Sequence, residues 1–309
     1  MPPPPTLRSS GDLLADRRYA YAEAALKEAD YHTAIDLALQ SLELAPSFAP
    51  AHALLGRARA LLGERDGAIE ALSKALDLEP EDPLGVGIDL ARLGALPLQE
   101  AIGAGYVRTL FDDYAGTFDK HLVKNLNYRG PELLRAAVRR AYAAYGAPTW
   151  AERVLDLGCG TGLVGRALAG TYATIDGVDL SPRMLALARK TRLYDRLHEG
   201  ELLDFVKEQP DRTADLVVAA DVFVYLAALD EIFGEVRRVL RRGGFFAFTV
   251  QAHEGEGIIL GEDSRYAHGE RYLRGLAEQT GFAVALFETV STRQDRGVDV
   301  PGFLAVLER

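Results

Sequence analysis

The sequence predicts two parts, a small all-α unit followed by an α/β unit with a mostly parallel sheet. Two observations lead to this prediction. Residues 30–48 align with residues 64–82 at a constant shift, which is typical of a helical repeat. From Arg153 onward, apolar strand patterns alternate with helix patterns, which favours a parallel sheet with helices on both faces. A chain of 309 residues is long enough for both parts.

Composition excludes several classes of protein. A formal net charge of −10 argues against a nucleic-acid partner, and the basic run at 237–242 is expected to complement a helix C-terminus. The single cysteine, Cys159, excludes an internal disulfide and a multi-cysteine metal site, and we expect no metal. Residues 1–14 are rich in proline and predict a disordered tail rather than a signal peptide. No apolar run is long enough to span a membrane, so we expect a cytoplasmic protein with no membrane partner.

The aligned repeats share small residues and closing prolines. The matched positions are Ala34 and Ala68, Ile35 and Ile69, Leu42 and Leu76, Leu44 and Leu78, and Pro46 and Pro80. Residues 15–82 resemble tetratricopeptide (TPR) repeats, with His52 where a large aromatic residue is usual, and residues 83–95 look like a capping half repeat. We therefore predict a TPR-like domain over 15–98. It either packs as a lid or dimer surface or binds a protein partner in a shallow groove.

A helical linker is predicted over residues 99–148. Six apolar residues share one helix face, namely Tyr106, Leu110, Phe111, Tyr114, Phe118 and Leu122. Gly116 should interrupt this helix. The next helix is expected to begin at Pro131 and to end at Gly146.

The core is predicted over residues 149–309. Strands are expected at 153–158, 173–181, 195–200, 214–221, 245–251, 282–290 and 302–309, and helices at 162–170, 181–191, 230–244 and 270–281. The final strands could form an antiparallel end of the sheet. Ligands of such sheets bind at the carboxyl ends of the strands.

The stretch "RVLDLGCGTGLVG" (153–165) has two interpretations. Gly160, Gly162 and Gly165 fit the spacing of a dinucleotide-binding loop, whereas the series beginning at Asp156 fits a loop that binds S-adenosylmethionine (SAM). A carboxylate before the glycines would repel a pyrophosphate but attract the ammonium and sulfonium groups of SAM. Asp179 could bind ribose hydroxyls in either case.

Residues 105–309 resemble a class I SAM-dependent methyltransferase, through "VLDLGCGTG", "VDLS", "HEGELLD", "DLVVAADVFVYL" and "LRRGGFFAFTV". The order of the two parts also resembles predicted bacterial methyltransferases that carry TPR repeats. The resemblance implies a Rossmann-like fold with seven strands, the last antiparallel, and a reaction that leaves S-adenosylhomocysteine. It implies a cofactor site formed by Asp156, Gly158, Gly160, Gly162, Asp179, Leu180, Met184, Glu201, Leu202 and Asp221, with Tyr114 and Phe118 covering it. Met184 could instead be helix core, and Tyr114 and Phe118 could join the two domains.

Methyl transfer from a sulfonium is an in-line displacement that requires mainly positioning, with a base only for a protonated acceptor. The candidate catalytic residues are His268, expected on a loop after the fifth strand, Asp221 and Tyr225, with His253 as a further base. Arg265, Tyr266 and His268 could bind the acceptor, and Arg293 is a weaker anion-binding candidate. The leading hypothesis is a methyltransferase acting on an oxygen or nitrogen of a small molecule or peptide. The alternatives are a protein methyltransferase whose repeats recruit the target, and a binding module with an inactive catalytic half.

Overall fold

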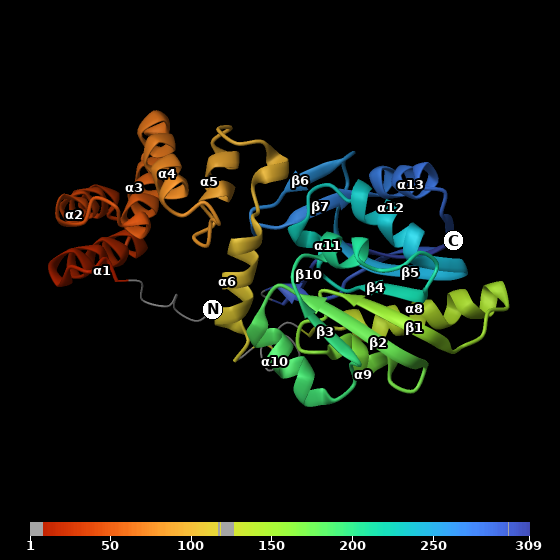
Figure 1. Ribbon diagram of the computed structural model, residues 1–309. Helices are drawn as coiled ribbons and strands as arrows, with labels where there is room; N and C mark the ends of the chain where they lie inside the picture. The colour runs from red at the N-terminus through yellow and green to blue at the C-terminus, as the bar shows by residue number, and fades with distance from the viewer. Residues whose placement is uncertain (1–8, 117, 119–126, 296) are drawn as a thin grey trace. The chain divides into compact units, whose positions relative to one another are not determined.

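The computed structural model describes residues 9–116, 118, 127–295 and 297–309. The chain forms two compact units, Met1–Asp113 and Tyr114–Arg309 (Figure 1). Most of the predicted tail at 1–14 lies outside the described residues. Within them, no helix is both long and apolar enough to cross a membrane.

The first unit is all helical. Its helices are α1 (Leu13–Lys27), α2 (Tyr31–Leu44), α3 (Ala49–Leu61), α4 (Arg65–Leu78), α5 (Val86–Arg92), a 3-10 turn at Leu98–Glu100 and most of α6 (Ala104–Tyr114). Helix α1 packs on α2, α3 packs on α4, and α2 packs on α3 (Figure 1). The helices therefore form consecutive pairs, as the repeat predicts. Their assignment to the TPR family stays a prediction.

Small residues allow these helices to approach closely. A Cβ atom added at Gly56 would lie 2.5 Å from Cγ of Leu72, so α3 and α4 meet at a position that has no room for a side chain. Ala68 and Ala75 of α4 are fully buried, at 0% and 1% exposure. Small residues on both helices therefore permit the close packing of α3 on α4.

The second unit is an α/β fold. Its strands are β1 (Ala151–Leu157), β2 (Tyr172–Asp179), β3 (Arg196–Glu199), β4 (Ala214–Ala219), β5 (Leu240–His253), β6 (Ile258–Leu260), β7 (Tyr266–Gly269), β8 (Ala283–Val290), β9 (Gln294–Asp295), β10 (Val298–Asp299) and β11 (Gly302–Glu308). The main sheet has the order β3-β2-β1-β4-β5-β11-β8. Neighbours from β3 to β5 run parallel, whereas β11 is antiparallel to both β5 and β8. The predicted mixed sheet with an antiparallel last strand is confirmed.

Helices cover both faces of this sheet (Figure 1). They are α8 (Gly130–Tyr145), α9 (Leu163–Leu168), α10 (Pro182–Thr191), α11 (Leu202–Lys207), α12 (Asp230–Val239) and α13 (Glu270–Gln279). One core contains apolar residues of α8 and α9, and the other contains those of α11, α12 and α13. Helix α8 begins with Pro131 in its first turn and ends at Gly146 in the left-handed conformation, as expected.

Two local predictions were wrong. The helix predicted over 230–244 ends at Val239, and β5 begins at the next residue, which is extended with ψ 144°. The supposed loop after the fifth strand contains β6 and β7, and β7 runs parallel to the end of β5 beside Gln251–His253. The structure also has helix α11 at 202–207, where no element was predicted. The short elements α11, β6 and β7 leave no periodic signal in the sequence.

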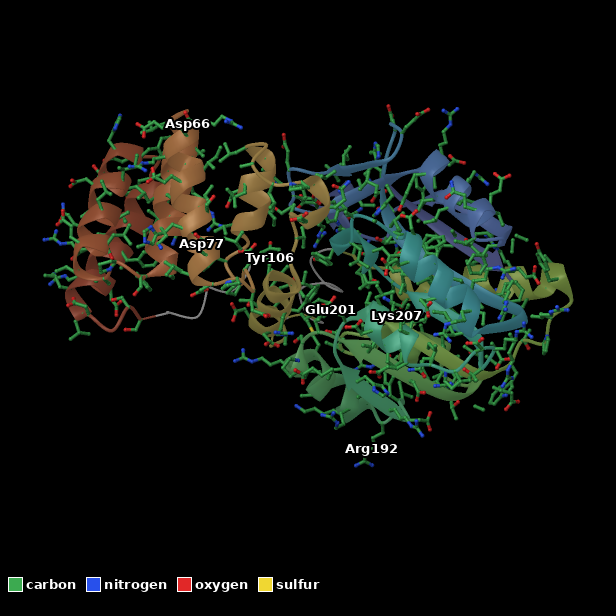
Figure 2. All side chains as sticks on the ribbon, turned by 45° about the horizontal axis from the view of Figure 1, so that its top comes forward. Asp66, Asp77, Tyr106, Arg192, Glu201 and Lys207 are labelled. Atoms are coloured by element: carbon green, nitrogen blue, oxygen red, sulfur yellow. The ribbon has the colours of Figure 1, made fainter. Side chains whose placement is uncertain are left out.

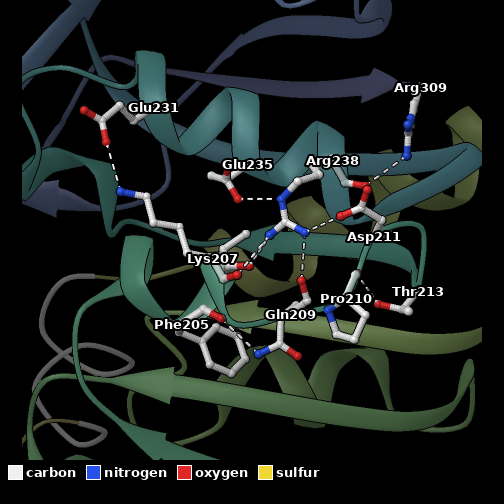
Figure 3. Close-up of polar contacts among 11 residues, drawn as sticks. Phe205, Lys207, Gln209, Pro210, Asp211, Thr213, Glu231, Glu235, Arg238 and Arg309 are labelled. Atoms are coloured by element: carbon white, nitrogen blue, oxygen red, sulfur yellow. Dashed lines mark hydrogen bonds and ion pairs between the residues drawn. The ribbon is translucent and has the colours of Figure 1, made fainter.

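Arg238 joins the elements around the start of β4. Its guanidinium donates hydrogen bonds to Glu235 and Asp211 and to the backbone oxygens of Val206 and Gln209 (Figure 3). The residue lies in the last turn of α12, where the sequence predicts cations. These contacts fix α11 and the turn before β4 to α12. Figure 2 labels Glu201 and Lys207, which stand at the two ends of α11.

Candidate cofactor and acceptor site

The turn between β1 and α9 is built from glycines in a conformation that side chains disfavour. Gly158, Gly160 and Gly162 have φ angles of +70°, +52° and +89°. Apart from its two chain neighbours, no heavy atom of the described residues lies within 4 Å of the position that a Cβ atom of Gly160 would occupy, so this part of the loop borders open space in the described part of the chain. The backbone of the loop can therefore approach a ligand closely.

Asp179 shapes the same loop from the end of β2. Its Oδ2 accepts a hydrogen bond of 2.9 Å from the backbone N–H of Gly160, and its Oδ1 accepts one of 2.9 Å from that of Ser181. Strands β1 and β2 are parallel neighbours, so their carboxyl ends lie at one edge of the sheet. The predicted ribose-binding carboxylate and the glycine loop are thus brought together.

Asp156 lies beneath the loop rather than on its surface. Its side chain is fully buried, and its Oδ2 accepts a hydrogen bond of 2.6 Å from the hydroxyl of Tyr194. Burial raises the pKa of Asp156 to about 7, although the Tyr194 hydroxyl opposes this shift. The fully buried carboxylate presents no exposed surface to a ligand, so the expected position of Asp156 near the SAM ammonium stays a prediction.

The residues expected around adenine separate into two groups. Met184 is 1% exposed and Leu202 is 8% exposed, and both pack in the core, so the simpler interpretation of Met184 as helix core is correct. Leu180 is half-buried beside Asp179, and Glu201 is exposed immediately before α11. These last two remain candidates for contact with the cofactor.

Tyr114 and Phe118 contact each other. Their ring centroids are 5.2 Å apart in an edge-to-face arrangement, and both residues are half-buried. The predicted helix ends at Tyr114, before Gly116, as expected. Leu122, the last residue of the predicted apolar face, lies outside the described residues. A covering role for this pair over the cofactor stays a prediction.

A second polar cluster follows β4, around Asp221. This residue has a φ of +55°, which is uncommon for a side chain other than glycine and is found at functional sites. Its carboxylate accepts hydrogen bonds from the hydroxyl of Thr292, at 3.0 Å, and from the guanidinium of Arg293, at 3.2 Å. Its backbone N–H donates to Oγ1 of Thr249. Arg293 is only 5% exposed, so this is a buried ion pair.

The cluster extends to a second arginine. Arg293 also donates a hydrogen bond of 2.8 Å to Gln251 and lies 3.7 Å from Asp263. The guanidinium carbon of Arg265 lies 5.8 Å from the centre of the Tyr225 ring. Burial would lower the pKa of Arg265, but Tyr225, Asp221 and Asp263 together raise it above its usual value. Two cations and two carboxylates therefore meet beyond the carboxyl ends of β4 and β5.

The structure corrects the predicted role of His268. This residue lies in β7 rather than on a loop, it has no exposed surface, and its Nε2 is 3.1 Å from the backbone oxygens of both Leu226 and Ala227. Burial lowers the pKa of His268 to about 4. Because its imidazole is fully buried and its Nε2 is held by two backbone carbonyl groups, His268 presents no free group to an acceptor.

Two neighbours of His268 are also unsuited to their predicted roles. Tyr266 is 1% exposed, so it belongs to the core rather than to an acceptor-binding surface. His253 is held by its own turn, where Nδ1 accepts a hydrogen bond from the N–H of Gly255 and Nε2 lies 3.0 Å from the oxygen of Gly257. Asp221, Tyr225 and Arg265 are the predicted acceptor-side residues that the structure does bring together.

The loop fits SAM better than a dinucleotide. Helix α9 begins at Leu163, before the third glycine of the dinucleotide pattern. That glycine, Gly165, faces Tyr194, whose hydroxyl would be 2.7 Å from an added Cβ atom, so it serves packing. Among the described residues, Oδ1 of Asp156 is a buried acceptor without a partner, and a negative charge beneath the loop suits a cationic ligand.

Comparison with known proteins agrees with this geometry. Residues 155–248 match a family model described as a methyltransferase domain. The chain is 35% identical over 102 residues to a malonyl-[acyl-carrier protein] O-methyltransferase of Halalkalibacterium halodurans, covering 31% of this chain and 38% of that protein. It is 31% identical over 144 residues to a demethylmenaquinone methyltransferase of Tropheryma whipplei, covering 45% and 56%. The matches thus span roughly four to six tenths of these relatives' length.

Solved structures of SAM-dependent methyltransferases are also similar. One from Leishmania major has a TM-score of 0.49 at 20% identity, covering 66% of this chain and 81% of that chain. One from Archaeoglobus fulgidus has a TM-score of 0.47 at 16% identity, covering 63% and 100%. The family model and the curated relatives thus identify residues 155–248, within the sheet of the second unit, as a methyltransferase domain of the SAM-dependent kind.

Proposed function

We propose that this chain transfers the methyl group of SAM to an oxygen or nitrogen atom of a small molecule or peptide. The observation that carries this proposal is the loop of Gly158, Gly160 and Gly162 fixed by the carboxylate of Asp179 at the edge of a methyltransferase sheet. The polar cluster around Asp221 follows the next strand, β4, and is the proposed acceptor side.

The cofactor would be held by residues from three strand ends. The open backbone at Gly160 would receive its amino-acid part, the carboxylate of Asp179 its ribose hydroxyls, and Leu180 and Glu201 its adenine. When bound, SAM supplies an electrophilic methyl group on a sulfonium leaving group. Asp156 would stabilise the positive charge from beneath the loop.

The acceptor side would act by positioning. Asp221, held in place by Thr292 and Arg293, and Tyr225, beside Arg265, would orient the polar group of the acceptor. Holding the reacting atoms in line can contribute roughly 7–11 kcal/mol to the lowering of the barrier. The low exposure of Arg293 also limits water at this side, which strengthens the electrostatic interactions there.

The names of the relatives support a small acceptor. The matched proteins include O-methyltransferases, among them those for malonyl-[acyl-carrier protein] and one of ubiquinone biosynthesis in Thiobacillus denitrificans. These names concern those proteins, and for this chain they favour an oxygen acceptor on a small molecule or on a carried group.

The test is transfer of a labelled methyl group from SAM by the full-length protein. Carboxylic acids, phenols and amines would each be tested as acceptors. Each compound would be paired with an analogue that lacks the free carboxyl, hydroxyl or amino group. We expect label in one class and formation of S-adenosylhomocysteine in equal amount. Binding of S-adenosylhomocysteine without transfer to any class, including peptides, would favour a binding module with an inactive catalytic half.

The alternative is a protein methyltransferase whose helical unit recruits the target. The first unit exposes large apolar side chains, including Leu13 at 89%, Leu61 at 58% and Tyr21 at 50%, and such side chains can contribute to a docking surface. A chain restricted to residues 114–309 separates the two functions. Unchanged transfer to a small acceptor supports the leading proposal, whereas loss of transfer only to a protein acceptor supports the alternative.

A further inference from the structure

Tyr194 lies under the glycine loop, in the segment between α10 and β3. Its ring occupies the space that side chains at three glycines would need. Added Cβ atoms at Gly162, Gly165 and Gly177 would lie 3.1, 2.7 and 2.9 Å from atoms of Tyr194. One aromatic side chain therefore packs against the loop, the helix that follows it and the neighbouring strand β2. Side chains at these positions would displace the ring.

The hydroxyl of Tyr194 forms two hydrogen bonds. It donates a hydrogen bond of 2.6 Å to Oδ2 of Asp156 and accepts one of 3.3 Å from the backbone N–H of Gly165. Asp156 precedes Gly158 by two residues, at the end of β1. Because Oδ2 is bound by Tyr194, the orientation of the carboxylate is fixed, and Oδ1 remains a buried acceptor with no partner in the described part of the chain.

We propose that Tyr194 is a positioning residue of the cofactor site, which supports the glycine loop with its ring and fixes the Asp156 carboxylate with its hydroxyl. This inference rests on the proposed function, because it concerns the same cofactor. It assigns to Tyr194 a role that no local motif around this residue indicates. The ring fixes the position of the glycine loop, and the hydroxyl stabilises the ionised form of the Asp156 carboxyl group beneath the loop.

The charge of Asp156 gives this proposal a measurable signature. Burial, with a smaller contribution from the nearby Asp179, raises the pKa of Asp156 to about 7 against the opposing effect of the hydrogen bond from Tyr194. The other titratable groups that interact with Asp156 are Cys159, Tyr172 and Tyr128, whose pKa values burial and nearby carboxylates raise. A carboxylate under the loop attracts the ammonium of the cofactor, so affinity should rise with pH as Asp156 loses its proton.

The experiment is a calorimetric titration of S-adenosylhomocysteine into the full-length protein between pH 6 and pH 8.5. Tyr194→Phe keeps the ring but removes the hydroxyl, so the pH at which affinity rises should move up by about one unit. Because the ionised fraction of Asp156 at pH 7 would then fall from about one half to about one tenth, affinity near pH 7 should fall by about fivefold. Tyr172→Phe is the matched control, because its hydroxyl donates to the backbone oxygen of Gly165 at 3.5 Å, without a bond to Asp156. It should leave both the affinity and the pH profile unchanged.

Asp156→Asn provides a second test that does not depend on Tyr194→Phe folding. This variant should bind weakly at every pH in the range, with no rise near pH 7, and adding Tyr194→Phe should change little. A wild-type pH profile in Tyr194→Phe, or in Asp156→Asn, would overturn the inference, even if the melting temperature falls. Failure of the wild-type protein to bind S-adenosylhomocysteine at any pH would instead overturn the proposed function.

Discussion

The guanidinium of Arg293 lies 3.2 Å from the carboxylate of Asp221, and both side chains are almost removed from solvent, at 6% and 15% exposure. Asp221 follows β4, whereas Arg293 follows β8 at the far end of the sheet order. This ion pair therefore connects the turn proposed to orient the acceptor with a segment from the edge of the sheet. Asp221 also has a left-handed backbone conformation, with a φ of +55°.

Arg293→Met should destabilise the protein and impair transfer. Removing one partner of a buried ion pair leaves an uncompensated charge, which costs about 3–5 kcal/mol. We expect a lower melting temperature and a larger loss of kcat than of S-adenosylhomocysteine affinity. Arg140→Met is the control, because Arg140 forms a 2.6 Å ion pair with Glu288 that is about half exposed and should contribute less than about 1 kcal/mol. Equal effects of the two variants on stability would contradict this account.

Asp179→Ala should weaken cofactor binding while leaving the fold intact. The variant loses both the proposed ribose contact and the hydrogen bond that Oδ2 accepts from Gly160, so affinity for S-adenosylhomocysteine should fall by about tenfold to a hundredfold. Asp195→Ala is the matched control, since Asp195 accepts a hydrogen bond of 2.9 Å from the backbone of Ile175 nearer the other end of β2. Calorimetry at one pH compares the two, and equal affinities would remove Asp179 from the site.

His268 should make the folded state sensitive to acid. Its pKa is about 4 when folded, against 6.5 for the ordinary side chain, so the unfolded chain binds the proton more readily. The stability that the neutral side chain contributes is present above pH 6.5 and is lost as the pH falls towards 4, by roughly 3 kcal/mol. Urea unfolding of the wild type and of His268→Gln at pH 7, 5.5 and 4.5 measures this. If the difference in unfolding free energy between the wild type and His268→Gln were the same at all three pH values, protonation of His268 would not account for the sensitivity to acid.

Asp156→Asn should stabilise the ligand-free protein at high pH. The folded pKa of about 7 exceeds the ordinary value of 3.8, so the stability contribution of the carboxylic acid is present below pH 3.8 and is lost as the pH rises through 7. The full difference is on the order of 4 kcal/mol. We expect Asp156→Asn to be more stable than the wild type at pH 8 and to lose much of that advantage by pH 5. If Asp156→Asn were less stable than the wild type at pH 8, ionisation of Asp156 would cost the folded protein little free energy.

Elements with a strong local signal were predictable from the sequence, whereas those positioned by long-range pairing were not. The strands from β1 to β5 have strong apolar runs, and the loop between β1 and α9 has glycines with positive φ angles. Both signals depend only on residues close together in the sequence. The hairpin of β6 and β7 has only short strands, and its position depends on pairing with the end of β5. His268 was therefore placed on a loop, although pairing buries it completely.

The candidate site shows the same limit. Asp179 and the glycines lie within one continuous motif, so their meeting follows from adjacent parallel strands. The contact between Tyr194 and Asp156 joins residues 38 positions apart in different segments, and nothing near Tyr194 in the sequence indicates a partner. Arg293 differs from Tyr194, because its charge alone predicts an anionic partner, and in the structure that partner is the carboxylate of Asp221.

The most direct test of the central claim is a calorimetric comparison of S-adenosylhomocysteine and NADH binding to the full-length protein at pH 8, where Asp156 is largely ionised. The account predicts a one-to-one complex with S-adenosylhomocysteine that Asp179→Ala weakens, and no measurable heat with NADH. Binding of NADH in place of S-adenosylhomocysteine would contradict it and restore the dinucleotide interpretation of the glycine loop.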